Sequence, residues 1–146
     1  MSKQLGRLTA SDRIGDALMK ALLRVGLAPQ HMYLLTVPGR RTGKPYSTPV
    51  ILVEDLGGRY LVAPYGERAW VKNARAAGAV QLSRGRARER LSITPLDPKR
   101  AAPILREYVR AVPAPRPYFD ATRDSPVEEF EAEADRHPVF RLGPLS

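Results

Sequence analysis

The stretch HMYLLTVPGRRTGKPYSTPVILVED, His31 to Asp55, decides the fold. It contains two β-rich apolar runs, HMYLLTV (His31–Val37) and YSTPVILVED (Tyr46–Asp55), on either side of PGRRTGKP. The prolines and glycines between them predict a turn, so the two runs are expected to be neighbouring strands. Pro49 lies inside the second run and removes a ladder donor, which predicts an edge or a bulge at that point.

The rest of the chain continues this hairpin pattern with a few helices between the strands. The sequence predicts a turn at Leu56–Arg59, a strand at Arg59–Gly66, a helix at Glu67–Gly78 ending in a glycine C-cap, and a strand pair within Ala79–Leu96 around Gly85. A helix at Lys99–Ala111, opened by Asp97-Pro98, and a proline-rich connector without regular structure at Val112–Asp120 are expected next. The chain is then expected to form a short acidic helix within Ser125–Pro138, with Ser-Pro as its N-cap and first residue, and a last strand at Val139–Leu142. Helices do not alternate regularly with the strands as βαβ units require. The prediction is therefore an α+β fold, with a mostly antiparallel sheet or small barrel and helices packed outside.

Composition indicates one globular domain spanning residues 1–146. The 146 residues are 43% hydrophobic and 27% charged, and none is cysteine. The absence of cysteine excludes disulfides, thiolate metal ligands and thiol catalysis, and fits a cytoplasmic protein.

The N-terminal region, residues 1–29, lacks the apolar core of a signal peptide. Its segment Ile14–Leu27 predicts an amphipathic helix with an apolar face formed by Ile14, Leu18, Ala21, Leu22 and Val25. Packing of this face on a protein core is the favoured interpretation, and contact with an anionic membrane surface stays open.

The formal net charge of +9 points to anionic partners. Positive charge concentrates before Arg90, whereas VEEFEAEAD near the C-terminus is acidic. The alternating arginines Arg84, Arg86, Arg88 and Arg90 predict one basic face of a strand, most simply a solvated one. Because aromatic residues are few and no nucleic-acid-binding motif occurs, nucleic acid is not the expected partner, although a basic nucleic-acid or membrane-binding module remains an alternative.

Two familiar site patterns fail in this chain. The turn resembles a phosphate-binding P-loop, but only three residues separate Gly39 from Gly43, and Pro45 follows Lys44. The two histidines, His31 and His137, lie far apart without metal-ligand spacing, so no metal site is expected. His137 precedes a proline and is interpreted as a turn residue.

One combination does indicate a binding site. The basic turn is followed by the proline-containing strand, by Ala63-Pro64-Tyr65-Gly66, and by a helix carrying Trp70 and Asn73. Arginine matches phosphate and carboxylate oxygens, and backbone groups freed near Pro49 are available to a flat heterocycle. A basic mouth leading to an apolar cleft suits a cofactor with a planar ring and an anionic tail, whereas the simpler interpretation is a hairpin turn beside a core tryptophan.

The run from Tyr33 to Gln81 resembles the deazaflavin-dependent nitroreductase family of split β-barrel flavin-binding oxidoreductases. The resemblance rests on the order LLTVPGRRTG, a Pro-containing strand, a Gly-rich hairpin turn, VAPYG and WVKN. It implies a split barrel that binds coenzyme F420 and passes hydride from the reduced deazaflavin to an electrophilic acceptor such as a quinone, a nitroaromatic or an unsaturated compound. FMN is the alternative cofactor. The resemblance also leaves a homodimer open.

The resemblance implies a role for each matching residue. The phosphate and glutamate carboxylates are expected to be bound by Arg40, Arg41, Thr42 and Lys44, with Gly43 letting the backbone approach. The deazaflavin ring is expected to lie beside Pro49 and Val50. The ribityl–phosphate region is expected to be lined by Ala63, Pro64, Tyr65 and Gly66, and the adjoining wall to be formed by Trp70 and Asn73. Some relatives carry Ser-Lys-Gly where this chain has Pro64-Tyr65-Gly66, which removes a hydroxyl and a charge. Tyr118 and Tyr46 are the candidate catalytic residues, because a phenol can contact substrate or donate a proton.

Overall fold

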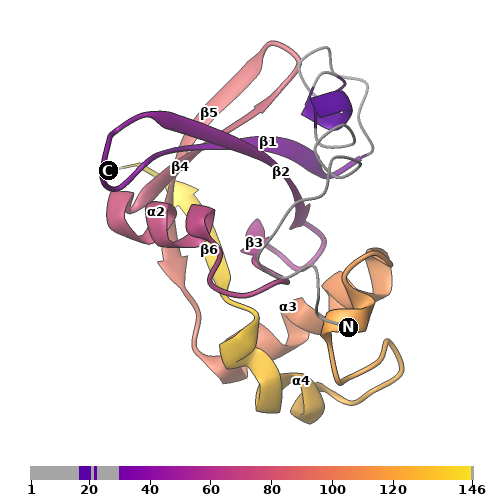
Figure 1. The fold of residues 1–146 in the computed structure, drawn as a ribbon. Coiled ribbons are helices and arrows are strands. Elements are labelled where there is room, and N and C mark those ends of the chain that lie inside the picture. The colour runs from indigo at the N-terminus through magenta and orange to yellow at the C-terminus, as the bar shows by residue number, and fades with distance from the viewer. Residues whose placement is uncertain (1–16, 21, 23–29, 146) are drawn as a thin grey trace.

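The computed structural model describes residues 17–20, 22 and 30–145 of the chain. Its elements are β1 (Met32–Pro38), β2 (Pro45–Val53), β3 (Tyr60–Val62), α2 (Ala69–Ala77), β4 (Ala79–Arg84), β5 (Ala87–Pro95), α3 (Pro98–Ala111), the 3-10 turn η2 (Arg116–Tyr118), α4 (Val127–Glu133), the 3-10 turn η3 (Ala134–Arg136) and β6 (Val139–Pro144) (Figure 1). The predicted α+β class, with helices outside an antiparallel barrel, is confirmed.

The six strands form a closed barrel in the order β1-β2-β3-β6-β5-β4. Every pairing is antiparallel, and β4 returns to β1 through the pairs from Leu34↔Ser83 to Thr36↔Gln81. β6 enters between β3 and β5, so the barrel joins segments that are far apart in the sequence.

Strand β2 leaves the barrel wall partly open. It pairs with β1 along Pro45–Ile51, but only Leu52 and Val53 pair with β3. Pro49 lies opposite Leu34 in this unbroken register, so the predicted edge position is confirmed and the strand has no bulge at the proline. On the side away from β1, the backbone of residues 45–51 has no strand partner among the described elements.

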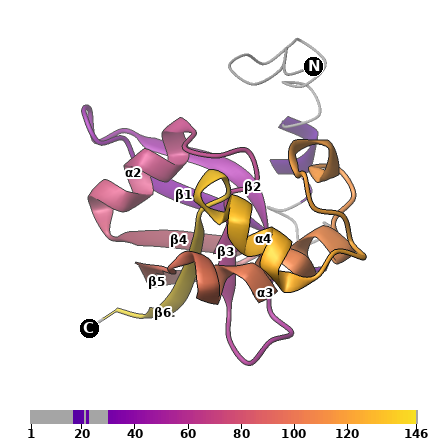
Figure 2. The same cartoon turned by 90° about the horizontal axis from the view of Figure 1, so that it is seen from below.

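Apolar side chains form two main cores, one on each side of the barrel wall. Leu35, Leu61, Leu82 and Phe140 belong to the core inside the barrel. The second core lies under α3 and α4, which are together on one side of the barrel and apart from α2 (Figure 2). Because alternate side chains of a strand point to opposite faces, β2, β3 and β6 contribute to both cores.

Local capping signals place the helices as predicted. Gly78 ends α2 in the left-handed conformation, with φ of 72°, and its N–H donates to the Ala74 carbonyl. Asp97 begins α3 by accepting a hydrogen bond from the Arg100 backbone N–H at 2.9 Å.

The predicted helix Ile14–Leu27 lies mostly outside the described residues. Residues 17–20 and 22 are helical. Met19 and Leu22 pack beside Leu34, which supports the packing interpretation for this part of the helix. Leu18 was placed on the apolar face but is 61% exposed, so that assignment is wrong.

Three predicted boundaries require correction. Strand β3 ends at Val62 rather than Gly66, because only Tyr60–Val62 meets β6 and the chain then turns. The proline-rich connector does contain a regular turn, η2. Helix α4 begins at Val127 after Pro126, so the Ser-Pro cap was placed too early.

Two predictions about single residues are also wrong. His137 is not a simple turn residue: it is 3% exposed and hydrogen-bonded through both ring nitrogens. Arg84 does not share a strand with Arg88 and Arg90, because the turn at Gly85 ends β4 before β5 begins.

Candidate functional site

The turn between β1 and β2 is a compact, hydrogen-bonded structure. The Gly39 N–H donates to the Lys44 carbonyl at 2.8 Å, and the Gly43 N–H donates to the Gly39 carbonyl at 2.8 Å. Gly43 has φ of 76°, a conformation that glycine adopts without strain. The Thr42 hydroxyl accepts from the Lys44 N–H at 3.2 Å. These bonds fix the backbone from which the cationic side chains project.

Helix α2 anchors this turn through Asn73. The side chain is 5% exposed, and its Oδ1 accepts two hydrogen bonds from Arg40, one from the backbone N–H at 3.1 Å and one from Nη1 at 2.8 Å. A single amide oxygen therefore positions both the turn and the Arg40 guanidinium. Among the described residues, Arg41 and the Lys44 ammonium have no hydrogen-bond or ion-pair partner, so their charges are available to a ligand.

A cavity of about 500 Å³ lies between the turn, β2 and α2. Its walls are Gly39, Arg40, Arg41, Thr42, Tyr46, Ser47, Thr48, Ala69, Trp70 and Asn73. The turn supplies cations, α2 supplies the indole, and β2 supplies hydroxyl groups on the strand whose outer edge is unpaired. This is a basic rim beside a largely apolar cleft, the arrangement that an anionic molecule with a flat apolar ring requires.

Gly39 and Tyr46 are fitted to each other at the mouth of the cavity. A Cβ atom at Gly39 would lie 2.7 Å from Cε2 of Tyr46, so the ring occupies the space that any other residue would fill. Tyr46 is 51% exposed and is therefore free to contact a ligand. Ser47 is held across the hairpin by a hydroxyl–hydroxyl hydrogen bond of 2.9 Å with Thr36.

The predicted binding residues fall into three groups. Arg40, Arg41, Thr42, Trp70, Asn73 and the candidate catalytic residue Tyr46 all line the cavity, and Gly43 and Lys44 belong to the same turn. Val50 and Ala63 are buried in the core inside the barrel, and Pro49 is partly buried on β2. Pro64, Tyr65, Gly66 and Tyr118 lie outside the cavity wall.

Tyr118, the other candidate catalytic residue, forms an aromatic pair with Tyr65. Their rings meet edge to face with centroids 4.7 Å apart, and the Arg68 guanidinium lies 5.3 Å from the Tyr65 ring centroid. Burial, and then the neighbouring Tyr118, raise the pKa of Tyr65, while Arg68 opposes the shift. Tyr65 therefore stays protonated at neutral pH and is available as a hydrogen-bond donor.

Sequence reasoning missed four residues of the cavity wall. Gly39 and Ala69 carry no chemical signal by themselves. Ser47 and Thr48 directly precede Pro49, and their hydroxyl groups next to a predicted edge position were the signal that would have identified them.

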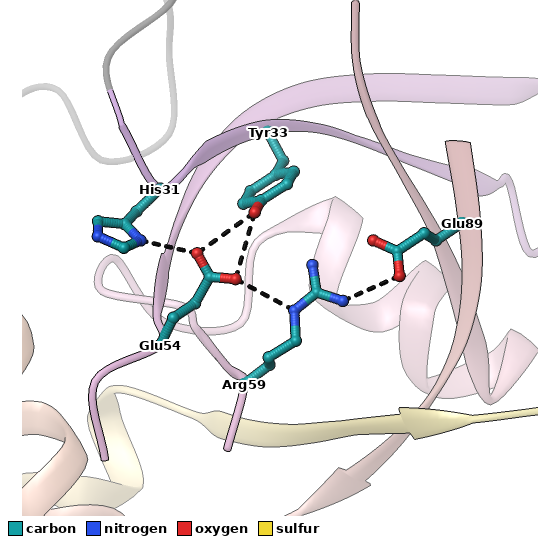
Figure 3. Close-up of polar contacts among 5 residues, drawn as sticks. All are labelled: His31, Tyr33, Glu54, Arg59 and Glu89. Atoms are coloured by element: carbon teal, nitrogen blue, oxygen red, sulfur yellow. Dashed lines mark hydrogen bonds and ion pairs between the residues drawn. The ribbon is translucent and has the colours of Figure 1, made fainter. Parts of the chain in front are cut away.

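A second polar cluster joins residues of β1 and β5 to the connection between β2 and β3 (Figure 3). The Glu54 carboxylate accepts from the Tyr33 hydroxyl at 3.2 and 3.3 Å and from Nε of Arg59 at 3.1 Å, and it lies 2.7 Å from Nδ1 of His31. Arg59 also donates to Glu89 at 3.0 Å. Tyr33 on β1 and Glu89 on β5 lie two positions before the interior residues Leu35 and Leu91, so they share the inward face of their strands. The cluster therefore places paired polar groups next to the apolar interior.

The electrostatics of this cluster follow from burial and pairing. Burial opposes ionisation of Glu54, but the hydrogen bonds from its three neighbours outweigh burial and lower its pKa. Burial and the adjacent Glu54 raise the pKa of Tyr33. The cluster is thus an ionised carboxylate held by donors, which is a stabilising arrangement.

Within the described residues, no group of three or more His, Cys, Asp or Glu side chains is arranged to hold a metal ion. No helix in this part of the chain has both the length and the apolar character needed to cross a membrane.

Solved structures share this architecture. A structure described as F420-H2 dependent reductase FDR-A aligns with a TM-score of 0.54 and 24% identity, covering 77% of this chain and 94% of its own. A structure described as a domain-swapped dimer gives 0.58 and 20%, covering 92% and 99%. A putative pyridoxamine 5'-phosphate oxidase from Listeria innocua gives 0.52 and 14%, covering 94% and 95%. These likenesses establish the split-barrel fold.

Sequence comparison gives the family. No curated protein matches the chain. The family model described as F420H(2)-dependent quinone reductase matches residues 16–127, which include the whole cavity wall. The chain therefore belongs to the F420H(2)-dependent quinone reductase family and is a deazaflavin-dependent reductase.

Proposed function

We propose that this protein reduces a quinone-type acceptor at the cavity between the Gly39–Lys44 turn, β2 and α2, with the anionic tail of F420H2 held by the turn. The observation that carries the proposal is the pairing of available cations with an apolar wall around one cavity of about 500 Å³. On this proposal the chain acts as one deazaflavin-binding domain.

The cationic rim is suited to phosphate and carboxylate groups. Arg41 and Lys44 bring charges without partners among the described residues, and Asn73 orients Arg40 while leaving other guanidinium N–H donors for a ligand. Charge-assisted hydrogen bonds contribute roughly 1.5–3 kcal/mol each. Two or three of them are sufficient to retain the tail of the cofactor. Pro64 and Tyr65 replace the hydroxyl and charge of some relatives, so the turn carries more of the anion binding in this chain.

The opposite wall suits the flat ring. Trp70 offers an apolar surface, Ser47 and Thr48 offer hydroxyl groups, and the outer backbone edge of residues 45–51 has no strand partner. When bound, F420H2 supplies a hydride from C5 of its ring. The residues of the wall orient that ring and exclude water from the acceptor.

Reduction of a quinone to a hydroquinone takes one hydride and one proton, so a proton donor completes the reaction. Tyr46 is the better placed of the two candidates, because it lines the cavity and is half exposed. Tyr118 lies outside the wall, paired with Tyr65, and on this proposal it contacts the acceptor rather than the cofactor.

The test is a fluorescence titration of the purified protein with oxidised F420. We expect saturable binding that Arg41→Ala weakens by about tenfold or more. Arg88→Ala is the matched control, because Arg88 is exposed on β5, lies outside the cavity wall and removes the same unit of charge. FMN, which has a phosphate but no glutamate tail, is expected to bind more weakly. Absence of F420 binding, or equal losses in both variants, refutes the proposed site.

The proposal also covers the oligomeric state of the protein and its contact with a membrane surface. We propose a homodimer, which is supported by the domain-swapped dimer formed by one structural relative. Light scattering of the purified chain tests this directly. Contact of the N-terminal region with a membrane surface concerns residues mostly outside the described part, and vesicle co-sedimentation tests it.

A further inference from the structure

Two ionisable side chains are almost completely buried on the side of the barrel covered by α4. Glu133, the last residue of α4, is 2% exposed, and His137 is 3% exposed. Nε2 of His137 lies 2.8 Å from Oε1 of Glu133. None of the roles assigned to the cavity residues uses this pair.

The hydrogen-bond geometry determines how many protons the pair holds. Nδ1 of His137 lies 2.7 Å from the Pro64 carbonyl oxygen, which only accepts, so Nδ1 carries a proton. The contact between Nε2 and the carboxylate then needs a second proton, because a bare nitrogen and an ionised oxygen repel each other at 2.8 Å. The pair therefore holds one more proton than a neutral imidazole beside an ionised carboxylate.

The same pair joins three segments that are distant in sequence. The Glu133 carboxylate accepts from the backbone N–H groups of Asp120 at 3.1 Å and Ala121 at 2.7 Å. The Phe119 ring stacks on the His137 imidazole, with centroids 3.8 Å apart and planes 16° apart. On its other side His137 holds the Pro64 carbonyl.

The Arg136 side chain faces the pair from the surface. Nη2 of Arg136 lies 3.8 Å from Oε1 of Glu133 and 2.9 Å from Oδ2 of Asp120. Arg136 is exposed and its main partner is Asp120. At 3.8 Å Arg136 does not hydrogen-bond to Glu133, so the short contact of this carboxylate with a side chain is the one with Nε2 of His137.

The anchored carbonyl lies just before the helix that forms the cavity wall. The Ala63 N–H donates to the Pro138 carbonyl at 2.8 Å, which ties the same segment to the chain beside His137. The Arg68 N–H donates to the Gly66 carbonyl at 2.8 Å, and α2 begins at Ala69. Ala69 and Trp70 line the cavity, so the path from the buried pair to the cavity wall is short and hydrogen-bonded.

We propose that Glu133 and His137 are positioning residues of the reductase: they retain a shared buried proton and clamp the Ala63–Gly66 segment against Phe119–Ala121, which sets the start of α2 at the cofactor cavity. This inference rests on the proposed function for its effect on cofactor binding. The proton count is independent of that function.

The proton count is tested by nitrogen-15 NMR of the histidine rings in the full-length protein without cofactor. The chain has only two histidines, so His31→Gln assigns both signals. We expect Nδ1 of His137 to be protonated at neutral pH, together with either a protonated Nε2 or a protonated Glu133 carboxyl group, which carbon-13 NMR of the glutamate side chains detects. A bare Nδ1, the form that neutral histidine favours in water, overturns the proposal, and so does a bare Nε2 beside an ionised Glu133 carboxylate.

The positioning role is tested with F420 titrations of two variants. In Glu133→Gln the carboxamide N–H donates to Nε2 and its oxygen still accepts from the Ala121 N–H, so of the contacts of this side chain only the 3.1 Å bond from the Asp120 N–H is lost. Binding is therefore expected within about twofold of wild type. In His137→Gln one side chain cannot bridge both partners, and binding is expected to weaken about tenfold. Equal binding by wild type and a folded His137→Gln variant overturns the role.

The two readouts separate the possible failures. If His137→Gln does not fold, Glu133→Gln decides: a tenfold loss of binding in that variant overturns the clamp, and near-wild-type binding with Nδ1 still protonated supports it. If wild type does not bind F420, the proposed function fails, and with it the positioning role, while the NMR result still decides the proton count.

Discussion

Two substitutions of Asn73 separate its effect on protein stability from its effect on the charge of Arg40 in the basic turn. Asn73→Ala removes both hydrogen bonds from Arg40. One of these involves a charged donor, worth roughly 1.5–3 kcal/mol, and the other a neutral one, worth roughly 0.5–1.5 kcal/mol. Arg40 is exposed, so water replaces much of the lost interaction, and we expect a net loss of about 1–2 kcal/mol. For a chain of this length that lowers Tm by about 5 °C.

Asn73→Asp changes the charge and keeps the geometry. Its carboxylate accepts both bonds from Arg40, so thermal unfolding is expected near wild type, but the guanidinium is neutralised beside the cavity. F420 affinity measured by fluorescence should therefore fall more in Asn73→Asp than in Asn73→Ala, by about tenfold relative to wild type. The two variants are thus expected to rank in opposite order in the two assays. If Asn73→Asp binds F420 as tightly as wild type, the anionic tail does not lie at Arg40.

Three other substitutions test separate parts of the structure. The pKa of Glu54 is lowered from an ordinary value of 4.5, so its contribution to the free energy of unfolding is full above that pH and is lost as the pH falls through the acid range. The free energy of unfolding of Glu54→Gln, measured with denaturant, should therefore depend less on pH in that range than the value for wild type. Identical pH profiles would contradict the paired carboxylate. Gly39→Ala should displace the exposed Tyr46 ring, which changes the free energy of unfolding by less than about 1 kcal/mol but weakens F420 binding. Unchanged binding would show that the position of the ring is unimportant. Asp97→Ala should cost about 1 kcal/mol of unfolding free energy through loss of the α3 cap, with F420 binding unchanged, and full stability would contradict the cap.

The sequence predicted those features of the fold that depend on short-range chemistry. Gly78 and Asp97 act within one helical turn of their position, and both caps were found where their residue types indicated. Pro49 indicated an edge because a missing N–H has the same effect in any sheet. Of the candidate site, the turn arginines and the α2 residues Trp70 and Asn73 were brought together around one cavity.

The features that were missed depend on partners far away in the chain. The length of β3 is set by β6, whose pairing residues lie about eighty positions later. His137 looked like a turn residue because the Pro64 carbonyl, 73 positions earlier, comes next to it only when the chain has folded. The Glu54 cluster draws on β1, the connection between β2 and β3, and β5, and no local pattern in any of these segments indicates it.

The position of β6 between β3 and β5 has a consequence for how the protein is made. Until residues 139–144 leave the ribosome, β3 and β5 have no partner at the place where the barrel must join, and both present open edges. Closure must therefore wait until β6 has been translated, and the nascent chain is expected to depend on chaperones longer than a protein whose neighbouring strands are consecutive.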